Sequence, residues 1–224
     1  MESVLFHGSD KIVEHPTPGG GRVHNDFGQG FYCTPSLELA REWACREQPS
    51  AFVNHYSFEP SYRLKVCNLA GPDYHVLNWL AILMANRVFD TKHPLPAAIK
   101  AYILDEFLPD LSGFDVIRGY RADDSYFDMA ESFLSGSLSL EWLQKALRLG
   151  HLGEQIFLQS QRAFDALVFT TAECVDKDLY GPLRMARDRK AREAFRKMKG
   201  VSADGVMALD IYREKWRNDD VRLR

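Results

Sequence analysis

The sequence predicts an α+β fold, and three observations lead to that class. Residues 52–58, FVNHYSF, alternate apolar and polar side chains with the period of two that is typical of a half-buried strand. Residues 74–89 carry a mostly apolar pattern that predicts a helix. Short strand-like segments lie scattered between helices and do not alternate with them regularly, which favours α+β over a regular α/β sheet.

The first part of the chain is predicted to form a strand, a loop, a strand and a helix. Residues 3–7 form a short apolar opening strand. A Pro/Gly loop follows over 15–22, HPTPGGGR, and a second strand over 30–34. We expect a helix over 36–46, because Ser36 is a typical N-cap and an acidic residue follows it closely.

The same signals predict the remaining elements. Strands are expected in short apolar segments, and helices where apolar residues recur every three or four positions. The second long helix, which begins at Pro94, should end before Pro109, since proline cannot continue a helix. The expected strands are 62–69, 115–119, 155–159 and 166–170, and the expected helices are 94–107, 125–134, 140–149, 162–167 and 183–199, with a charged, partly helical tail over 210–224.

Length and composition are those of an ordinary globular protein. The 224 residues suit one large domain or a domain with an insertion, and 46% of them are hydrophobic. A net charge of −3 gives no overall attraction to nucleic acid or membrane. The longest apolar stretch, 76–89, is too short and too polar to span a bilayer, and no signal peptide is apparent. We therefore predict a cytoplasmic protein with no membrane partner.

The cysteines indicate neither a disulfide framework nor a metal site. They show no CxxC pair and no spacing typical of metal ligands. In a chain of this size we expect them to be reduced residues that pack in the interior. The four are Cys33, Cys45, Cys67 and Cys174.

The triplet His7-Gly8-Ser9 lies at the end of the opening strand and is the first candidate for ligand binding. A histidine at a strand end can present a ring nitrogen to a sugar hydroxyl, and glycine beside it lets a ligand reach the backbone. The alternative is a polar turn after an edge strand. Such a short motif remains a hypothesis on its own.

The segment 27–34, FGQGFYCT, is the second candidate. Gly28 and Gly30 either form a plain tight turn or let the backbone approach a flat ligand that Tyr32 covers. No third glycine completes a dinucleotide-binding GxGxxG, and no Gly-Lys-Ser/Thr of a phosphate loop follows.

Two further motifs carry acidic or amide side chains. Glu154 and Gln155 begin a predicted strand, where successive side chains face opposite ways, so only one of them can point into a given site. A solvated strand start is the alternative. Asp123 and Asp124 can bind a metal, but adjacent acids more often begin a helix, and the helix over 125–134 follows them.

Taken in order, these motifs resemble the ADP-ribosyltransferase superfamily, on its diphtheria-toxin-like, poly(ADP-ribose) polymerase branch. The matching residues are His7-Gly8, the segment 28–32 (GQGFY) and Gln155 in EQIFL. The chain is similar, over roughly 3–170, to a bacterial family of predicted ADP-ribosyltransferases with HGS, DFGxGFYxT, ANR, ADD and DQ motifs. This resemblance implies a split β-sheet core with helical insertions.

The resemblance also implies a division of the chain. The ADP-ribosyltransferase-like domain would cover residues 1–172, with a helical insertion over about 73–112. A basic helical C-terminal extension would cover 173–224.

NAD is the co-substrate that the resemblance implies. Gln155 stands where the branch usually has glutamate; it can hydrogen-bond the 2′-hydroxyl of the nicotinamide ribose but carries no negative charge. Glu154 takes this role only if the register differs by one residue. Arg22 suits the pyrophosphate, with a plain surface charge as the alternative. The expected catalytic residues are Gln155, His7 and Tyr32, and the expected NAD-binding residues are His7, Gly8, Ser9, Arg22, Gly30, Tyr32 and Trp43.

The activity implied is mono-ADP-ribosylation of an intracellular macromolecule, either protein or nucleic acid, by a bacterial toxin of a toxin–antitoxin or phage-defence system. An antitoxin protein is the expected partner. The alternatives are an NAD glycohydrolase and a non-catalytic NAD or ADP-ribose binding module. Residues 183–199 carry eight Lys or Arg, which suit nucleic-acid phosphates; a solvated helix or an antitoxin-docking surface is the other interpretation. The arginines about one helical turn apart are Arg184, Arg187, Arg192 and Arg196.

Overall fold

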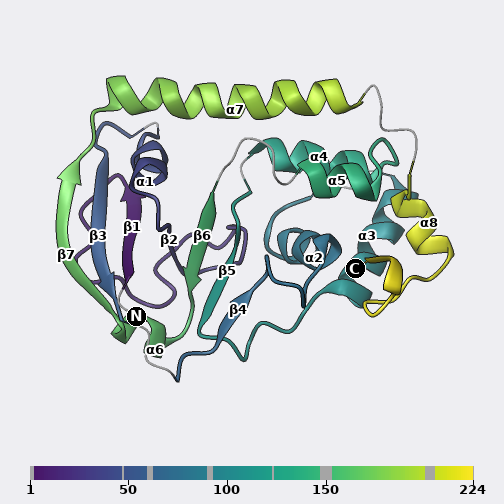
Figure 1. Cartoon of the computed structure of the whole chain (residues 1–224), viewed down its shortest axis with the longest axis horizontal. Coiled ribbons are helices and arrows are strands. Elements are labelled where there is room, and N and C mark those ends of the chain that lie inside the picture. The colour runs from purple at the N-terminus through teal and green to yellow at the C-terminus, as the bar shows by residue number, and fades with distance from the viewer. Residues whose placement is uncertain are drawn as a thin grey trace.

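The chain folds into a β-rich half and a helical half, with a long helix running over both (Figure 1). This computed structural model describes residues 3–46, 48–59, 63–89, 93–122, 124–146, 153–199 and 205–223. The strands are β1 (Ser3–Ser9), β2 (Phe31–Cys33), β3 (Phe52–Phe58), β4 (Val66–Asn68), β5 (Val116–Tyr120), β6 (Glu154–Leu158) and β7 (Leu167–Cys174). The helices are α1 (Leu37–Ala44), α2 (Val76–Asn86), α3 (Pro94–Phe107), α4 (Asp124–Leu134), α5 (Leu140–Ala146), α6 (Gln161–Asp165), α7 (Lys177–Lys199), α8 (Ala208–Arg213) and the 3-10 helix η2 (Val221–Leu223).

The strands form two sheets, with the orders β1-β3-β7 and β2-β6-β5-β4. Strands β4 and β5 pair in parallel, and the other neighbours pair antiparallel. A bridge between Phe6 and Thr34 joins β1 to the end of β2, with backbone hydrogen bonds of 2.9 Å in both directions. The predicted α+β class is therefore confirmed, and β1 and β2 lie side by side where the two sheets meet.

Several predicted elements agree closely with the structure. Strand β3 and helix α3 have the predicted bounds. Ser36 caps α1, as expected, because its hydroxyl accepts a hydrogen bond from the Leu39 amide. Strand β7 is longer than predicted and runs on to Cys174, since β3 pairs with it over its whole length.

The start of the basic helix was predicted wrongly. Helix α7 begins at Lys177 rather than Leu183, because the carboxylate of Asp176 accepts hydrogen bonds from the amides of Asp178 and Leu179 and so caps the helix. Pro182 lies inside the helix and costs it one backbone hydrogen bond.

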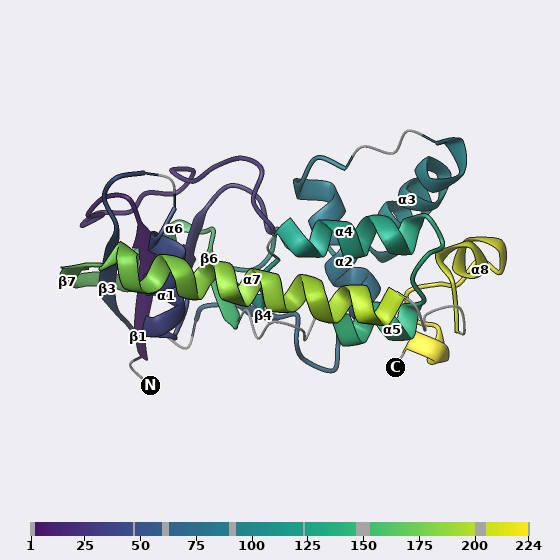
Figure 2. The same ribbon diagram turned by 90° about the horizontal axis from the view of Figure 1, so that it is seen from above.

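Helix α7 ties the two halves together. Seen from above, it runs over the β-rich half and then along the helical half (Figure 2). Near α1, Arg187 forms an ion pair of 2.7 Å with the buried carboxylate of Glu42. Near α4, Arg192 pairs with Asp128 at 3.1 Å, and Phe195 is buried in the helical core. Helix α7 therefore links the two halves, because it contacts α1 in the β-rich half and α4 in the helical half.

These contacts bear on the proposed phosphate-binding arginines. Arg187 and Arg192 neutralise carboxylates of the same chain, and Arg184 donates a hydrogen bond to the carbonyl of Cys45. Arg196 donates to a carbonyl within α7 itself. The one-turn spacing thus serves packing of the helix, and it gives little support to a nucleic-acid interface.

The helical half is built around α2, whose residues Val76 to Met84 are all buried. A helix that is apolar on all sides must be covered by other elements, and α3 packs against α2. The buried amide of Asn78 is satisfied by the carbonyl of Phe107 at 2.8 Å and by the side chain of Asn218. The last residues of α2, Asn86 and its C-cap Arg87, reach the β-rich half.

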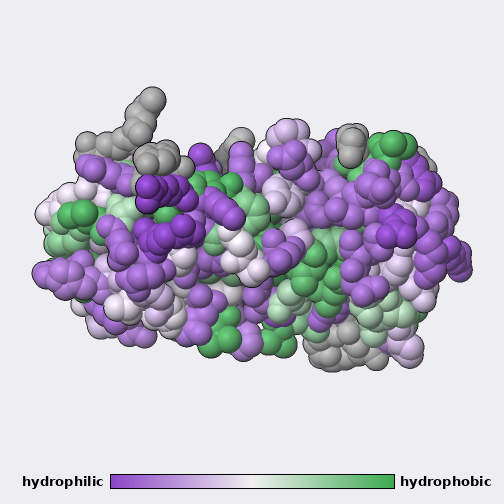
Figure 3. All heavy atoms as spheres, turned by 90° about the horizontal axis from the view of Figure 1, so that it is seen from below, coloured by the Kyte–Doolittle hydropathy of each residue, from purple (hydrophilic) through white to green (hydrophobic). Residues whose placement is uncertain are grey.

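None of the helices in the described part of the chain is both long enough and apolar enough to cross a membrane. On the face turned away from α7, apolar side chains lie in small groups between polar ones (Figure 3). All four cysteines are free; Cys33, Cys45 and Cys67 are buried as predicted, but Cys174 at the end of β7 is exposed.

Candidate functional site

His7 lies in β1 with its ring fixed by the neighbouring strand. Its Nδ1 is 2.7 Å from the carbonyl oxygen of Tyr32 in β2. A carbonyl only accepts, so Nδ1 carries the hydrogen and Nε2 carries the free lone pair. Burial lowers the pKa of His7 to about 4, which keeps the ring neutral at physiological pH. Nε2 is therefore an acceptor suited to a hydroxyl donor, and no described residue bonds to it.

The lowered pKa of His7 predicts a pH dependence of stability. Between pH 6.5 and about 4 the unfolded chain binds a proton at His7 that the folded protein does not bind. The contribution of this neutral histidine is therefore complete above pH 6.5 and is lost as the pH falls towards 4. The free energy of unfolding, measured against pH, should fall by up to about 3 kcal/mol more in the wild type than in His7→Asn. Parallel curves of the free energy of unfolding against pH for the two proteins would contradict this prediction.

Gly8 lies inside β1, opposite Val53 of β3, so a polar turn at this residue is excluded. A Cβ atom on Gly8 would lie 2.1 Å from the carbonyl oxygen of Ala40 and 2.7 Å from the amide nitrogen of Ala44. Glycine is thus what lets β1 approach the backbone of α1. Ser9, the last residue of β1, does serve the following turn, because its hydroxyl bonds to the backbone of Lys11.

Tyr32 is half-buried in β2 and fixes the glycine-containing loop before it. Its hydroxyl donates to the carbonyl of Gly28 at 2.6 Å and accepts from the amide of Phe27 at 3.1 Å. Its ring packs on Phe157 of β6, with centroids 4.8 Å apart. A Cβ on Gly30 would lie 2.3 Å from the Phe157 ring, so this glycine lets β2 lie close to β6. The packed-turn interpretation of the loop thus describes its structure, and Tyr32 is not completely covered.

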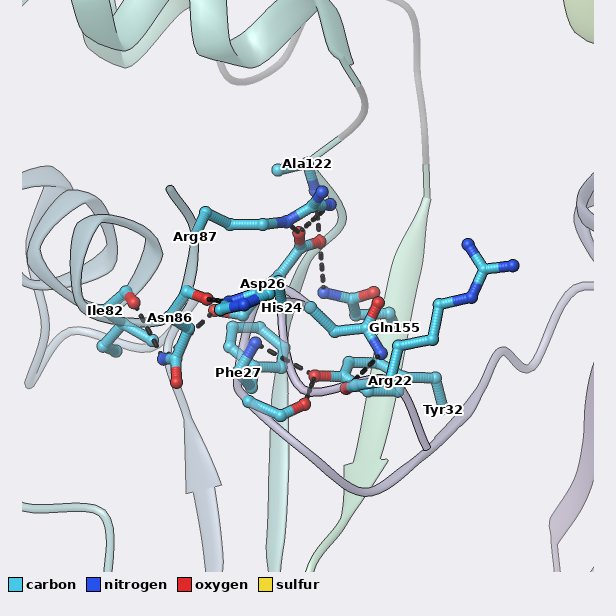
Figure 4. Close-up of polar contacts among 12 residues, drawn as sticks. Arg22, His24, Asp26, Phe27, Tyr32, Ile82, Asn86, Arg87, Ala122 and Gln155 are labelled. Carbon is cyan, nitrogen blue, oxygen red and sulfur yellow. Dashed lines mark hydrogen bonds and ion pairs between the residues drawn. The ribbon is translucent and has the colours of Figure 1, made fainter. Parts of the chain in front are cut away.

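Asp26 is the residue of this region that our sequence reasoning left out of the site. Its carboxylate is buried, and four N–H groups converge on it (Figure 4). Oδ1 accepts from Nε and Nη2 of Arg87, at 3.0 and 2.7 Å. Oδ2 accepts from the amide of Ala122 at 2.9 Å and from the carboxamide of Gln155 at 3.0 Å. Asp26 therefore joins the glycine-containing loop to α2, to the segment after β5 and to β6.

The motifs of the sequence offered a sign of this arrangement. Asp26 begins DFGQGFY, Arg87 ends ANR, Ala122 begins ADD, and Gln155 lies in EQIF. Each of the four motifs thus supplies one part of the same hydrogen-bonded group. Only the folded chain shows that they meet, because they are separated by 129 positions between the first and the last.

The structure shows which of the two neighbouring side chains in β6 points inward. Gln155 is 3% exposed and faces Asp26. Glu154 faces outward and forms an ion pair with Arg118 of β5, at 2.6 and 2.9 Å. The structure thus decides a question that the sequence left open: Gln155 is the side chain that faces inward, and Glu154 is not.

Two other expected NAD-binding residues lie in different surroundings. Arg22 is exposed, its guanidinium points away from the Asp26 group in Figure 4, and no ion-pair partner for it occurs among the described residues. Trp43 of α1 is buried, with the guanidinium of Arg121 lying 4.5 Å over its ring. Arg121 would have to move before the nicotinamide ring of NAD could stack on that face of Trp43. Asp123 and the side chain of Asp124 lie outside the described residues.

A separate cavity of about 550 Å³ lies in the helical half, between α5, α8 and η2. It includes none of the predicted site residues. Its carboxylates are engaged in local structure, since Glu141 accepts from the amide of Val206 and Glu214 binds Arg222. We assign no role to it.

Fold and site together define a two-sheet α+β domain whose motif residues meet around a buried carboxylate. The chain belongs to the family described as "Protein of unknown function (DUF3990)", whose model matches residues 3–169. This range contains His7, Asp26, Tyr32 and Gln155, and it ends before α7. Neither a curated protein nor a solved structure matches the chain.

Proposed function

We propose that this protein is a mono-ADP-ribosyltransferase that cleaves NAD and transfers ADP-ribose to a macromolecule. The observation that carries the proposal is the arrangement of three residues on adjacent strands. His7 of β1 bonds to the backbone of Tyr32 in β2, and β2 pairs with β6, which carries Gln155. These are the residues that the resemblance assigns to catalysis.

Each of these three groups has a role in binding or cleaving NAD. A neutral Nε2 on His7 accepts a hydrogen bond from the adenosine-side ribose, and the exposed part of Tyr32 stacks on the nicotinamide ring. Cleavage of the glycosidic bond develops an oxocarbenium-like centre. A hydrogen bond from the ribose 2′-hydroxyl to Gln155 accelerates the reaction only as far as it is stronger in that transition state than in bound NAD.

Groups around these three complete the proposed NAD site. The backbone of Gly8 holds the nicotinamide carboxamide, beside Ser9 and Gly30. The exposed guanidinium of Arg22 binds the pyrophosphate, for which its planar fork is well suited. Trp43 contributes a second aromatic surface once Arg121 is displaced from it.

The biological part of the proposal rests on the resemblance. The protein would act in the bacterial cytoplasm as a toxin of a toxin–antitoxin or phage-defence system, with an antitoxin protein as partner. The acceptor would be protein or nucleic acid. Because the arginines of α7 are largely engaged in internal contacts, that helix gives nucleic acid no preference over protein.

One observation favours a second candidate function, a non-catalytic NAD or ADP-ribose binding module. Gln155 is buried, and its amide nitrogen is already bonded to Asp26, as expected of a structural residue. Such a module would bind NAD without releasing nicotinamide. An NAD glycohydrolase, in which water replaces the acceptor, would release nicotinamide as the transferase does but would label no macromolecule.

An incubation with adenine-labelled NAD and a bacterial lysate separates these functions. We expect labelled macromolecule that is sensitive to protease, RNase or DNase according to the acceptor. At NAD concentrations below saturation, label should fall about tenfold in His7→Ala, the loss expected when one hydrogen bond that holds bound NAD is removed. The exposed His15 provides the control, since His15→Ala should keep full activity. Nicotinamide without label would indicate a glycohydrolase, and NAD binding with neither product would indicate the binding module.

A further inference from the structure

The contact between Asp26 and Gln155 fixes which way the carboxamide points. All four groups that reach the Asp26 carboxylate are N–H donors: two from Arg87, one from the Ala122 amide and one from Gln155. Asp26 is therefore an acceptor at every bond, as carboxylate oxygens are. The end of the Gln155 side chain that faces it must be the NH₂ group.

The oxygen of the carboxamide then points the other way. Oε1 of Gln155 has no hydrogen-bond partner among the described residues, whereas Nε2 is bonded to Asp26 and lies 3.5 Å from the carbonyl of Tyr120. Both Gln155 and Asp26 are almost fully buried, at 3% and 4% exposed, so a free rotation of the amide would leave buried polar groups unpaired. The carbonyl oxygen is thus the group held ready for a hydroxyl donor.

We propose that Asp26 is a positioning residue that holds the Gln155 carboxamide with Oε1 directed at the ribose 2′-hydroxyl, and that Asp26 is the reason this chain carries glutamine at a position where glutamate is usual. The inference rests on the function proposed above. A glutamate at position 155 would place a second carboxylate about 3 Å from Asp26, and two carboxylates that close share one proton. Glutamine supplies the same acceptor oxygen and adds the donor that Asp26 needs.

The variant Gln155→Glu tests this directly. In its protonated form, the introduced carboxyl group donates its O–H to Asp26 and presents a carbonyl oxygen, as glutamine does. In its ionised form, it repels Asp26. We expect Gln155→Glu to release nicotinamide at low pH and to lose about tenfold per pH unit above the raised pKa of the shared pair. Wild type should show no such decline, because arginine stays charged and the pKa of Tyr32 is raised.

A double variant that exchanges the acid and the amide between positions 26 and 155 tests whether activity is restored. In the double variant Asp26→Asn/Gln155→Glu, the introduced asparagine donates its amide N–H to the introduced carboxylate, so the repulsion is removed, although the Ala122 amide loses the oxygen to which it donates in the wild type. We expect this double variant to lose the pH-dependent decline and to recover nicotinamide release at neutral pH to within about tenfold of wild type. Glu154→Gln, on the outer face of the same strand, should behave like wild type.

Thermal stability against pH gives a readout that does not depend on activity. The folded state of Gln155→Glu should lose stability relative to wild type as the pH rises through the raised pKa, and the double variant should not. If wild type releases no nicotinamide, the proposed function fails, and these stability curves still decide whether Asp26 holds residue 155. Gln155→Glu with activity at high pH equal to or above that of wild type, or with a stability profile parallel to that of wild type, would overturn the inference.

Discussion

Gly8→Ala should destabilise the protein by about 3 kcal/mol, the upper end of what overpacking costs. The added methyl group would lie 2.1 Å from the carbonyl oxygen of Ala40 and 2.7 Å from the amide nitrogen of Ala44. Both obstacles are backbone atoms of α1, so no side chain can rotate away to make room. Strand β1 must therefore move away from α1. Since His7 is the neighbour of Gly8 on the same strand, its 2.7 Å contact with Tyr32 should be disturbed as well.

Thermal unfolding and nicotinamide release are the two measurements for Gly8→Ala. A loss of this size lowers the melting temperature of a chain of about 220 residues by roughly 10 °C. Gly113→Ala is the matched control, because a Cβ at Gly113 meets no atom within 4 Å. Equal melting temperatures for the two variants would mean that β1 does not need this close approach.

Asp26→Ala should be the most destabilising single substitution that we predict, with a loss of about 4 kcal/mol. It removes the acceptor of four N–H groups and leaves the guanidinium of Arg87 and the carboxamide of Gln155 without it in a largely buried place. The loss follows from the removal of a buried acceptor that several donors share, rather than from the net contribution of the ion pair. The glycine-containing loop, α2 and β6 thereby lose the carboxylate that joins them.

An exposed ion pair of the same sheet serves as the control for Asp26→Ala. Arg118 and Glu154 contact each other at 2.6 Å, but their side chains are 46% and 33% exposed. Arg118→Ala should therefore cost only about 0–1 kcal/mol. Denaturant unfolding of both variants measures the difference. A loss in Asp26→Ala no larger than in Arg118→Ala would show that the buried carboxylate is not what holds these segments together.

Local pattern was enough to predict much of the secondary structure. The alternation of FVNHYSF defined β3, the proline-bounded segment defined α3, and Ser36 marked the start of α1, because each depends on neighbours within a few residues. The same strand periodicity showed that only one of Glu154 and Gln155 could face inward. The local pattern was misleading at the basic helix, which was expected to begin at residue 183 but begins at Lys177.

Other properties depend on segments far apart in the chain, and only the tertiary structure decided them. Gln155 rather than Glu154 faces inward, where it contacts Asp26, which lies 129 positions away in the chain. The need for glycine at position 8 follows from the backbone of α1, and the role of the α7 arginines follows from carboxylates on α1 and α4. Sequence periodicity fixes which side chains share a face of one element, whereas a buried charge takes its partners from whichever segments the packed core brings to it.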